Sequence, residues 1–458
     1  MWSNKSRKRT CINNEPLTLL PAARSLLLQE DTLKEVLVLG GGIAGIQAAL
    51  DLAEQGVRVH LVERAPSLGG RMAQLDKTFP TNDCSTCILS PKMVDCARHP
   101  NIVLHTCSEL QAVAGEAGAF QVRVLQHPRY VDEERCTGCG ECALKCPRKV
   151  PDAFNLGLSQ RRAIYLYFPQ AVPLVMTIDP AQCTYLLRGK CGLCRQVCPA
   201  GAIDFEQQDR ELTLEVGAII VATGYDFYDP TPLSQYGYRR YPNVITALEF
   251  ERLISASGPT GGHLRRPSDG RPARRIGFVQ CTGSRHVRHN RYCSTVCCVH
   301  STKEAVLAWE HDPETRSYIF YTDLRGSGKG FREYMDRAAR EYQVTFVHGR
   351  VAQIVEEDDH NPVIKYEEAA TSRPQRMTVD LAVLATSLVP ARDAPRVAEI
   401  LGIELDEFGF VRVDPFAPTD TSRPGVLACG CCLGPADIPQ SVAQASAAAA
   451  RAAEWVLG

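Results

Sequence analysis

The stretch EVLVLGGGIAGIQAALDLAEQGVRVHLVER, residues 35–64, predicts a strand, a glycine-rich turn, a helix and a second strand in that order. An apolar run of β-favouring residues, Val36–Leu39, ends in Gly40-x-Gly42-x-x-Gly45. Apolar residues at helical spacing follow over residues 46–53, and a second apolar strand, Val57–Val62, ends directly before Glu63. This is the order of a dinucleotide-binding fingerprint.

Each residue of the fingerprint has a steric or electrostatic role. Gly40 allows a tight turn, Gly42 lets the backbone approach a pyrophosphate, and Gly45 lets the helix pack closely on the strand. The N-terminus of the helix offers free N–H groups to the phosphates. Glu63, 23 residues after Gly40, is placed to accept hydrogen bonds from ribose hydroxyls. Because all of this context accompanies the glycines, we predict a bound dinucleotide.

The length, net charge and cysteine content of the chain limit the kind of protein it can be. Its 458 residues have room for two or three domains, and a net charge of −1 gives no electrostatic case for nucleic acid or an anionic membrane surface. No apolar run approaches the ~20 residues of a membrane span. Twenty cysteines, clustered in a large α/β chain, favour metal or redox use over structural disulfides. We therefore expect a reducing and anaerobic cytoplasm.

The residues after the second strand indicate which dinucleotide binds. Arg64 leads to a glycine pair ending at Gly70, which permits a loop to lie against a cofactor, and Arg71 is placed to contact its phosphate. This segment resembles the second part of the FAD-binding pattern of disulfide-reductase flavoproteins. A later buried strand, residues 218–222, ends in Thr223-Gly224, a turn that brings the backbone near the cofactor in such proteins.

A Cys-x-x-Cys pair, Cys84 and Cys87, follows the FAD pattern. In disulfide-reductase flavoproteins a redox-active cysteine pair lies at a comparable distance after the glycine loop, and a thiolate beside a flavin can pass electrons to a disulfide. A redox dithiol that is catalytic is one interpretation, and thiols that only pack in the interior are the other.

Residues 135–199 interrupt the flavoprotein pattern with two runs of cysteines. The first run has the spacing of bacterial ferredoxins, C-x2-C-x2-C-x3-C-P, and the second has a longer first gap. We expect two [4Fe-4S] clusters, with a pair of zinc sites as the alternative. The ferredoxin pattern groups Cys136, Cys139, Cys142 and Cys198 on one cluster, and Cys183, Cys191, Cys194 and Cys146 on the other.

The segment after the insertion begins like a second nucleotide-binding unit. Residues 275–280 are typical of its first strand, but four cysteines stand where a glycine fingerprint for NAD(P)H would follow in the thioredoxin-reductase type of flavoprotein: Cys281, Cys293, Cys297 and Cys298. We infer that this domain has exchanged hydride transfer for single-electron transfer, with zinc or a structural thiol cluster as the alternative. Lys303, on the helix that follows, is a candidate catalytic residue that stabilises a reduced flavin by its charge.

The C-terminal segment carries the last part of the flavoprotein pattern. Its strand ends at Gly430, where FAD enzymes continue with an aspartate, but Cys431 stands there instead. Asp437 is a candidate substitute, and an alanine-rich helix follows from Gln440. The roles of Cys429, Cys431 and Cys432 stay open between ligation, redox chemistry and packing.

In combination, these motifs resemble the A-type component of heterodisulfide reductase and its bacterial relatives. Three shorter phrases also look like that family: residues 258–262, residues 290–293 and residues 437–439. The resemblance implies that the four cysteines from Cys281 to Cys298 ligate a third [4Fe-4S] cluster close to FAD. It also implies a cytoplasmic complex with iron–sulfur partner subunits, in which FAD relays or bifurcates electrons.

The resemblance also narrows the class of complex. The chain shows neither the extra N-terminal cluster domain nor the C-terminal ferredoxin domain of methanogen members, so we expect it to be closer to the shorter bacterial subunits. A hydrogenase, a dehydrogenase or a quinone-interacting membrane subunit is then a candidate partner, and a disulfide, a sulfur compound or a quinone-linked carrier is a candidate acceptor. The alternative function is a self-sufficient NAD(P)H-dependent disulfide reductase using Cys84 and Cys87, and the missing second fingerprint counts against it.

The expected fold is α/β, a two-domain Rossmann-type fold like that of FAD-dependent disulfide reductases, with an inserted α+β ferredoxin domain of the bacterial type. The expected boundaries are an N-terminal arm at 1–33, the first part of the FAD domain at 34–130, the ferredoxin insertion at 131–203, the continued FAD domain at 204–270, the second nucleotide-binding-like domain at 271–390 and the C-terminal part of the FAD domain at 391–458.

Overall fold

The computed structural model describes residues 35–326 and 328–457. The predicted N-terminal arm, residues 1–33, lies outside this part of the chain. The first sheet has the order β21-β22-β23-β11-β1-β2-β3, and the five strands from β23 to β3 run parallel. Its strands are β1 (Glu35–Leu39), β2 (Arg58–Val62), β3 (Ile102–His105), β11 (Ala218–Val221), β21 (Val413–Asp414), β22 (Ala417–Thr421) and β23 (Val426–Ala428).

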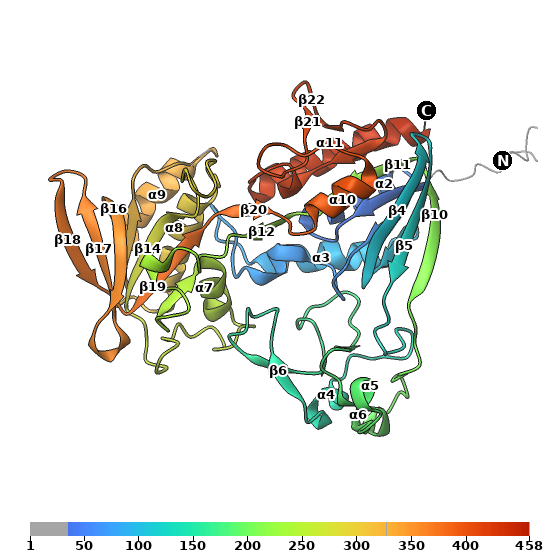
Figure 1. Cartoon of the computed structure of the whole chain (residues 1–458), viewed down its shortest axis with the longest axis horizontal. Helices are drawn as coiled ribbons and strands as arrows, with labels where there is room; N and C mark the ends of the chain where they lie inside the picture. Colours follow the sequence, from blue (N-terminus) through green and yellow to red (C-terminus); the bar gives the residue numbers. More distant parts are fainter. Residues whose placement is uncertain (1–34, 327, 458) are drawn as a thin grey trace, which may run out of the picture. The chain divides into compact units, whose positions relative to one another are not determined.

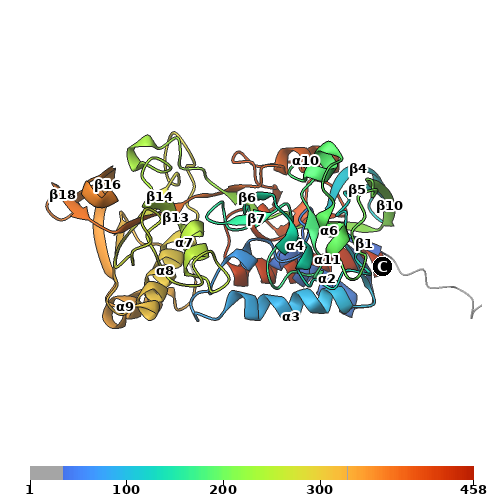
Figure 2. The same ribbon diagram turned by 90° about the horizontal axis from the view of Figure 1, so that it is seen from below.

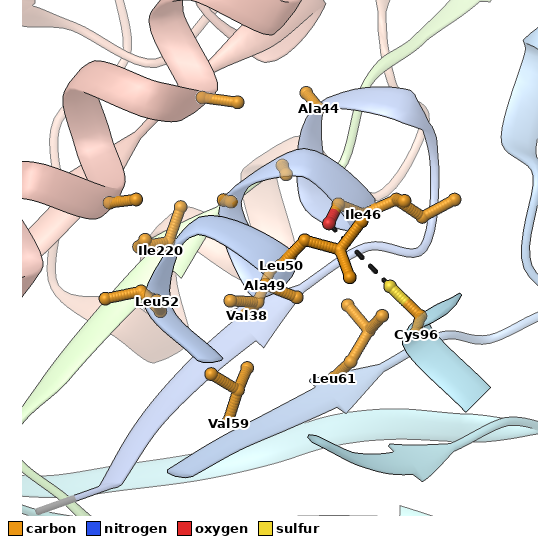
Figure 3. Packing of buried hydrophobic residues seen from close by; sticks show 14 of the residues in the cluster. Val38, Ala44, Ile46, Ala49, Leu50, Leu52, Val59, Leu61, Cys96 and Ile220 are labelled. Carbon is orange, nitrogen blue, oxygen red and sulfur yellow. Dashed lines mark hydrogen bonds between the residues drawn. The ribbon is translucent and has the colours of Figure 1, made fainter. Parts of the chain in front are cut away.

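Three helices cover one face of this sheet: α2 (Ile43–Glu54), α3 (Ser85–Arg98) and α11 (Ile438–Leu457) (Figure 1). Figure 3 shows the packing, in which Val38 and Ile220 of the sheet meet alanines and leucines of α2. The Cys96 thiol of α3 donates to the Ile46 carbonyl at 3.7 Å within this core. Cys96 therefore packs in the interior.

The opposite face of the first sheet packs on a second layer. It consists of the antiparallel strands β4 (Ser108–Glu116), β5 (Ala119–Gln126) and β10 (Arg210–Val216), with α10 (Ala394–Leu401) beside them. The cysteine-rich insertion lies between β5 and β10 in the sequence. Its elements are short: α4 (Glu141–Lys145), β6 (Lys149–Pro151), β7 (Gln160–Arg162), β8 (Ile164–Tyr165), β9 (Thr177–Ile178), α5 (Thr184–Arg188) and α6 (Leu193–Val197).

The second sheet has the order β13-β19-β14-β15-β16-β17-β18. Its strands are β13 (Val244–Thr246), β14 (Arg275–Thr282), β15 (Arg316–Tyr321), β16 (Thr345–Glu356), β17 (Pro362–Glu368), β18 (Arg373–Thr378) and β19 (Leu381–Thr386). One face is covered by α7 (Ala247–Ile254), α8 (Cys297–His311) and α9 (Phe331–Glu341), which lie side by side in Figure 2.

Short elements complete the chain. A two-stranded ribbon, β12 (Tyr225–Phe227) with β20 (Leu388–Pro390), lies where the chain passes between the two sheets. The short 3-10 helices are η1 (Gly70–Gln74), η2 (Ser234–Tyr236), η3 (Asp358–His360) and η4 (Gly430–Cys432). Two Rossmann-type units, one of them interrupted by a small α+β insertion, confirm the predicted fold class.

Candidate functional site

A cavity of about 290 Å³ lies where the carboxyl ends of β1 and β11 meet the N-terminus of α2. Ligands of parallel α/β sheets bind at this edge. The cavity is lined by most of the residues predicted to hold a cofactor: Gly40, Gly42, Glu63, Arg64, Gly70, Arg71, Thr223 and Gly224.

The glycines of the fingerprint divide into two kinds. A Cβ at Gly40, where φ is +114°, would lie 2.3 Å from the Ala222 carbonyl oxygen, and a Cβ at Gly45 would lie 1.8 Å from the Gly40 oxygen. A Cβ at Gly42 would meet only the Cα of Gly70, at 3.9 Å. Gly40 and Gly45 therefore serve the fold, whereas Gly42 keeps part of the cavity wall free for a ligand.

The Glu63 carboxylate is fixed at the end of β2 on the cavity wall. Its Oε2 accepts from the Gly41 N–H at 2.7 Å, and its Oε1 accepts from the Ala65 N–H at 2.7 Å. Burial raises the pKa of Glu63, and the two backbone donors oppose that rise. A carboxylate of fixed orientation thus stands where ribose contact was predicted.

Both predicted arginines border the cavity, and each contacts an aspartate. Arg71 donates to Asp226 at 2.5 Å, and Arg64 donates to Asp393 at 2.9 Å. Their guanidinium groups are therefore held in place at the cavity edge. A phosphate in the cavity would share these groups with the aspartates.

The C-terminal segment contributes to the same cavity, but not through Gly430. The Gly430 N–H donates to the Gln444 side chain at 2.9 Å, and a Cβ there would lie 2.9 Å from the Ala44 Cβ. The lining residues of this segment are Cys429 and Cys431, then Ala436 and Asp437 directly before α11, and Ile438 and Ser441 in its first turn. Burial raises the pKa of Cys432 to about 12, and its thiol donates to the Val221 carbonyl, as expected of a packing cysteine.

This donor set fits a flavin dinucleotide. The N-termini of α2 and α11 border the cavity and offer N–H groups to anionic atoms, and Asp437 lies buried at the second of them. Apolar side chains, including Ile43, Met72 and Leu75, supply a surface for an aromatic ring.

Lys303 is buried rather than solvated. Only 1% of the residue is exposed, and Nζ donates to Glu251 Oε1 at 2.5 Å and to the Lys77 carbonyl at 2.9 Å. Burial alone would raise the pKa of Glu251, but Lys303 and His300 hold it at about 2. The pair is therefore an ammonium and a carboxylate.

A small cavity of about 60 Å³ lies beside Lys303 and shares lining residues with the larger cavity. Lys303 and His300 line it, and Leu75, Tyr225, Asp437 and Ile438 line both cavities. The predicted position of Lys303 beside the cofactor site is thus compatible with the structure. Sequence reasoning missed Glu251, whose only signal was its place on the amphipathic helix α7.

Glu304 was missed as well. Glu251, His300 and Glu304 have ligand atoms within 4.8 Å of one another, and Glu251 and Glu304 are fully buried. His300 Nε2 donates to Glu251 Oε1 at 2.9 Å and lies 3.5 Å from Glu304 Oε1. The spacing of His300 and Glu304 on one helix face was visible in the sequence, but their burial was not.

The cysteines of the second predicted ferredoxin group lie together, and three of the four cysteines of the first group lie near one another. The second group, Cys146, Cys183, Cys191 and Cys194, lines a cavity of about 20 Å³. For the first group, burial raises the pKa of Cys142 to about 12, and the nearby thiols of Cys136, Cys194 and Cys198 add to the rise. Thiols of this kind lose their protons on binding a metal centre.

Of the four cysteines in the second domain, three come together at the end of β14. Hydrogen bonds link the thiols of Cys281, Cys297 and Cys298. The hydrogen bond from Cys297 and the charge of Arg285 lower the pKa of Cys281 to about 7, although burial opposes them. The Cys293 thiol instead accepts from the Thr295 N–H at 3.3 Å.

Cys84 and Cys87 form a disulfide at the start of α3. Cys84 caps the helix by accepting from the Cys87 N–H at 3.2 Å, and Cys87 is exposed. A β-bridge joins Cys84 to Lys77, whose carbonyl contacts Lys303. The pair is therefore separated from the small cavity by the segment that includes Lys77.

Three family matches agree with this architecture. Residues 35–92 match FAD dependent oxidoreductases, residues 129–152 match the 4Fe-4S binding domain, and residues 317–452 match pyridine nucleotide-disulphide oxidoreductases. None of the helices that the structure describes is long and apolar enough to cross a membrane.

Curated relatives match almost the whole chain. An A-type iron-sulfur subunit of the CoB--CoM heterodisulfide reductase of Methanopyrus kandleri is 51% identical over 95% of this chain and 67% of its own length. The A-type iron-sulfur subunit of the CoB--CoM heterodisulfide reductase of Methanocaldococcus jannaschii is 50% identical over 91% of this chain. The chain spans 63% of the length of that relative. In Methanothermobacter marburgensis, the A-type subunit of the "H(2):CoB-CoM heterodisulfide,ferredoxin reductase" is 47% identical over 92% of this chain and 63% of its own length.

Solved structures show a similar fold. Thioredoxin reductase from Lactococcus lactis has a TM-score of 0.52 at 14% identity, over 93% of this chain and 99% of the other. Thioredoxin reductase from T. acidophilum has a TM-score of 0.51 at 14% identity, over 93% of this chain and the whole of the other. At this identity the likeness concerns the fold alone.

Proposed function

Because the chain belongs to the family of A-type iron–sulfur subunits of heterodisulfide reductase, we propose that it is an FAD- and [4Fe-4S]-dependent electron-transfer subunit of a heterodisulfide-reductase-like complex. The observation that carries this proposal is the joint presence of the glycine-walled cavity and the two groups of ferredoxin-spaced cysteines in one compact unit.

The cofactors would be one FAD and three [4Fe-4S] clusters. Gly42, Gly70 and the N-terminus of α2 would hold the FAD phosphates, Glu63 the ribose, and the start of α11 the flavin end. The ferredoxin cysteines would hold two clusters in the grouping given above. Cys281, Cys293, Cys297 and Cys298 would hold the third, which requires Cys293 to turn from Thr295 toward the other thiols.

The residues of this chain would influence how easily the flavin accepts electrons. FAD supplies a centre that exchanges electrons both in pairs and singly, which allows relay or bifurcation. Lys303 would present a positive charge to the flavin from the small cavity, and Glu251 would hold it there. The clusters would carry single electrons to and from partner subunits.

The partners would be other iron–sulfur subunits of the complex in the cytoplasm. The name of the Methanothermobacter marburgensis relative includes hydrogen, the CoB-CoM heterodisulfide and ferredoxin. For this chain we propose that the donor side is a hydrogenase, a dehydrogenase or a quinone-interacting membrane subunit. The acceptor would be a disulfide, a sulfur compound or a quinone-linked carrier.

The second candidate is an NAD(P)H-dependent disulfide reductase, which the Cys84–Cys87 disulfide favours. Stopped-flow mixing of the anaerobically purified chain with NADH or NADPH separates the two functions. The electron-relay proposal expects no rapid bleaching of the flavin by either nucleotide alone, and rapid reduction by a low-potential one-electron donor. Rapid bleaching of the flavin by NADH or NADPH, together with a disulfide-reducing turnover that Cys84→Ser slows, would establish the second candidate instead.

A further inference from the structure

Glu304 stands out because its carboxyl group is fully buried and no donor reaches it. Its exposure is 0%, and no N–H or O–H group of the described residues donates a hydrogen bond to either oxygen. His300 Nε2 lies 3.5 Å from Glu304 Oε1, but it already donates to Glu251 at 2.9 Å. A buried polar group of this kind requires an explanation.

The charges around Glu304 decide its protonation state. The Lys303 ammonium already pairs with the Glu251 carboxylate at 2.5 Å. An ionised Glu304 would add an unpaired negative charge in a site closed to water, which is far more costly than binding a proton. Burial and the charge of Glu251 accordingly place the pKa of Glu304 well above its usual range.

Three further titratable groups near the pair do not change this balance, and the buried Arg252 guanidinium of α7 donates its hydrogen bonds elsewhere, to Asn155, Gln74 and Ser257. On the segment after η1, Asp76 donates its backbone N–H to Glu251, and burial raises the pKa of its carboxyl. On the same segment, the Lys77 side chain forms a half-exposed pair with Glu310. On α8, burial and the charge of Lys303 lower the pKa of His300.

A divalent cation bound by Glu251, His300 and Glu304 is the competing explanation. It would lie beside the Lys303 ammonium, which contacts the same Oε1 atom of Glu251 that His300 contacts. Two like charges would then share a buried site. A proton on Glu304 satisfies the carboxyl without adding that repulsion.

We propose that Glu304 acts as a neutral carboxylic acid that donates a hydrogen bond to Glu251 and thereby positions the Glu251–Lys303 pair beside the flavin cavity. It is a positioning residue, and the inference rests on the proposed role of Lys303. Because the role needs a neutral donor and not a negative charge, the amide of glutamine can replace the acid.

The test compares Glu304→Gln with Glu304→Met in the anaerobically purified holoprotein, and Glu314→Gln, at an exposed position, is the control. We expect Glu304→Gln and the control to keep the wild-type flavin midpoint potential and its pH dependence. Glu304→Met should change the flavin reduction equilibrium at least tenfold, or about 30 mV for the two-electron couple. A change in the flavin midpoint potential of Glu304→Gln as large as that of Glu304→Met, with or without loss of a bound divalent metal, would overturn the proposal. A flavin midpoint potential in Glu304→Met equal to that of the wild type would overturn it too.

Infrared spectroscopy of the oxidised holoprotein provides a readout that does not depend on flavin chemistry. We expect a carboxylic acid C=O band that shifts in D2O. The band should be lost in Glu304→Gln and should persist in Glu314→Gln, and this result does not depend on whether Glu304→Met folds. Absence of that band from the wild type would overturn the proposal. If the protein does not bind FAD, the preparation will contain no flavin but will still show the band, so failure of the proposed function can be distinguished from failure of this inference.

Discussion

Lys303 Nζ lies 2.5 Å from Glu251 Oε1 in a site where at most 1% of either residue is exposed. This contact joins α8 to α7, and the Lys77 carbonyl ties it to the segment after η1. One ion pair therefore links the second domain to the segment that borders the flavin cavity.

Replacing Lys303 by methionine should destabilise the protein by about 3–5 kcal/mol, because Glu251 would keep a buried charge without its partner. The double variant Lys303→Met/Glu251→Leu should lose less than Lys303→Met alone. Denaturant unfolding of the anaerobic protein measures the free energy of unfolding of both variants. Lys77→Met is the control, because it breaks a half-exposed pair and should change stability by less than ~1 kcal/mol. Equal loss in the single and double variants would contradict the ion-pair account.

Acid should weaken this region through Glu251. Its pKa is about 2 in the folded protein and 4.5 as the ordinary value, so the stabilisation is fully present above pH 4.5 and is lost as the pH falls toward 2. We expect Glu251→Gln to be less stable than wild type near neutral pH, with the difference shrinking in acid. Circular dichroism across an acid titration checks this, and a difference that grows in acid would show the opposite sign of shift.

Two glycines of one fingerprint should respond differently to alanine. Gly42→Ala places a Cβ in ordinary contact with Gly70 and without a clash, so the fold should keep its stability within ~0.5 kcal/mol while the amount of bound flavin falls. Gly40→Ala forces a left-handed residue against a backbone oxygen and should cost about 1–3 kcal/mol. Flavin content and melting temperature of the two variants decide this. A stable Gly42→Ala protein with full flavin would show that the cavity does not hold the pyrophosphate there.

Crossed ligation in the insertion is testable with one serine in each run. Cys198→Ser should disturb the cluster of Cys136, Cys139 and Cys142, and Cys146→Ser the cluster of Cys183, Cys191 and Cys194. Each variant should lose up to about four iron atoms and change a different electron paramagnetic resonance signal. Cys96→Ser is the control, since Cys96 packs in the core. If both variants alter the same signal, the grouping is wrong.

The strands and turns of the flavoprotein units could be predicted because their residues repeat local patterns. Residues 36–39 and 57–62 form β1 and β2 to within one residue at each end, and the strand predicted at 275–280 is the start of β14. The helix predicted from residue 46 begins earlier, at Ile43, directly after Gly42 at the N-cap position. Apolar alternation and glycine spacing are local, so the sequence displays them.

The ion-pair site could be predicted only in part. Lys303 was a candidate because of its distance from the cysteines, but Glu251 is 52 residues away in sequence and meets it only after α7 and α8 pack. The orientation of Cys293 likewise depends on the loop before α8 and not on the cysteine spacing. Contacts made by tertiary packing leave no periodic pattern in the chain.

The most direct test of the central claim is the content of iron, acid-labile sulfide and flavin in the protein purified without oxygen. Three cubane clusters and one FAD predict about 12 iron atoms, about 12 sulfides and one flavin per chain. About 8 iron atoms with one flavin would show that Cys281, Cys293, Cys297 and Cys298 hold no cluster, and zinc without flavin would contradict the electron-transfer account altogether.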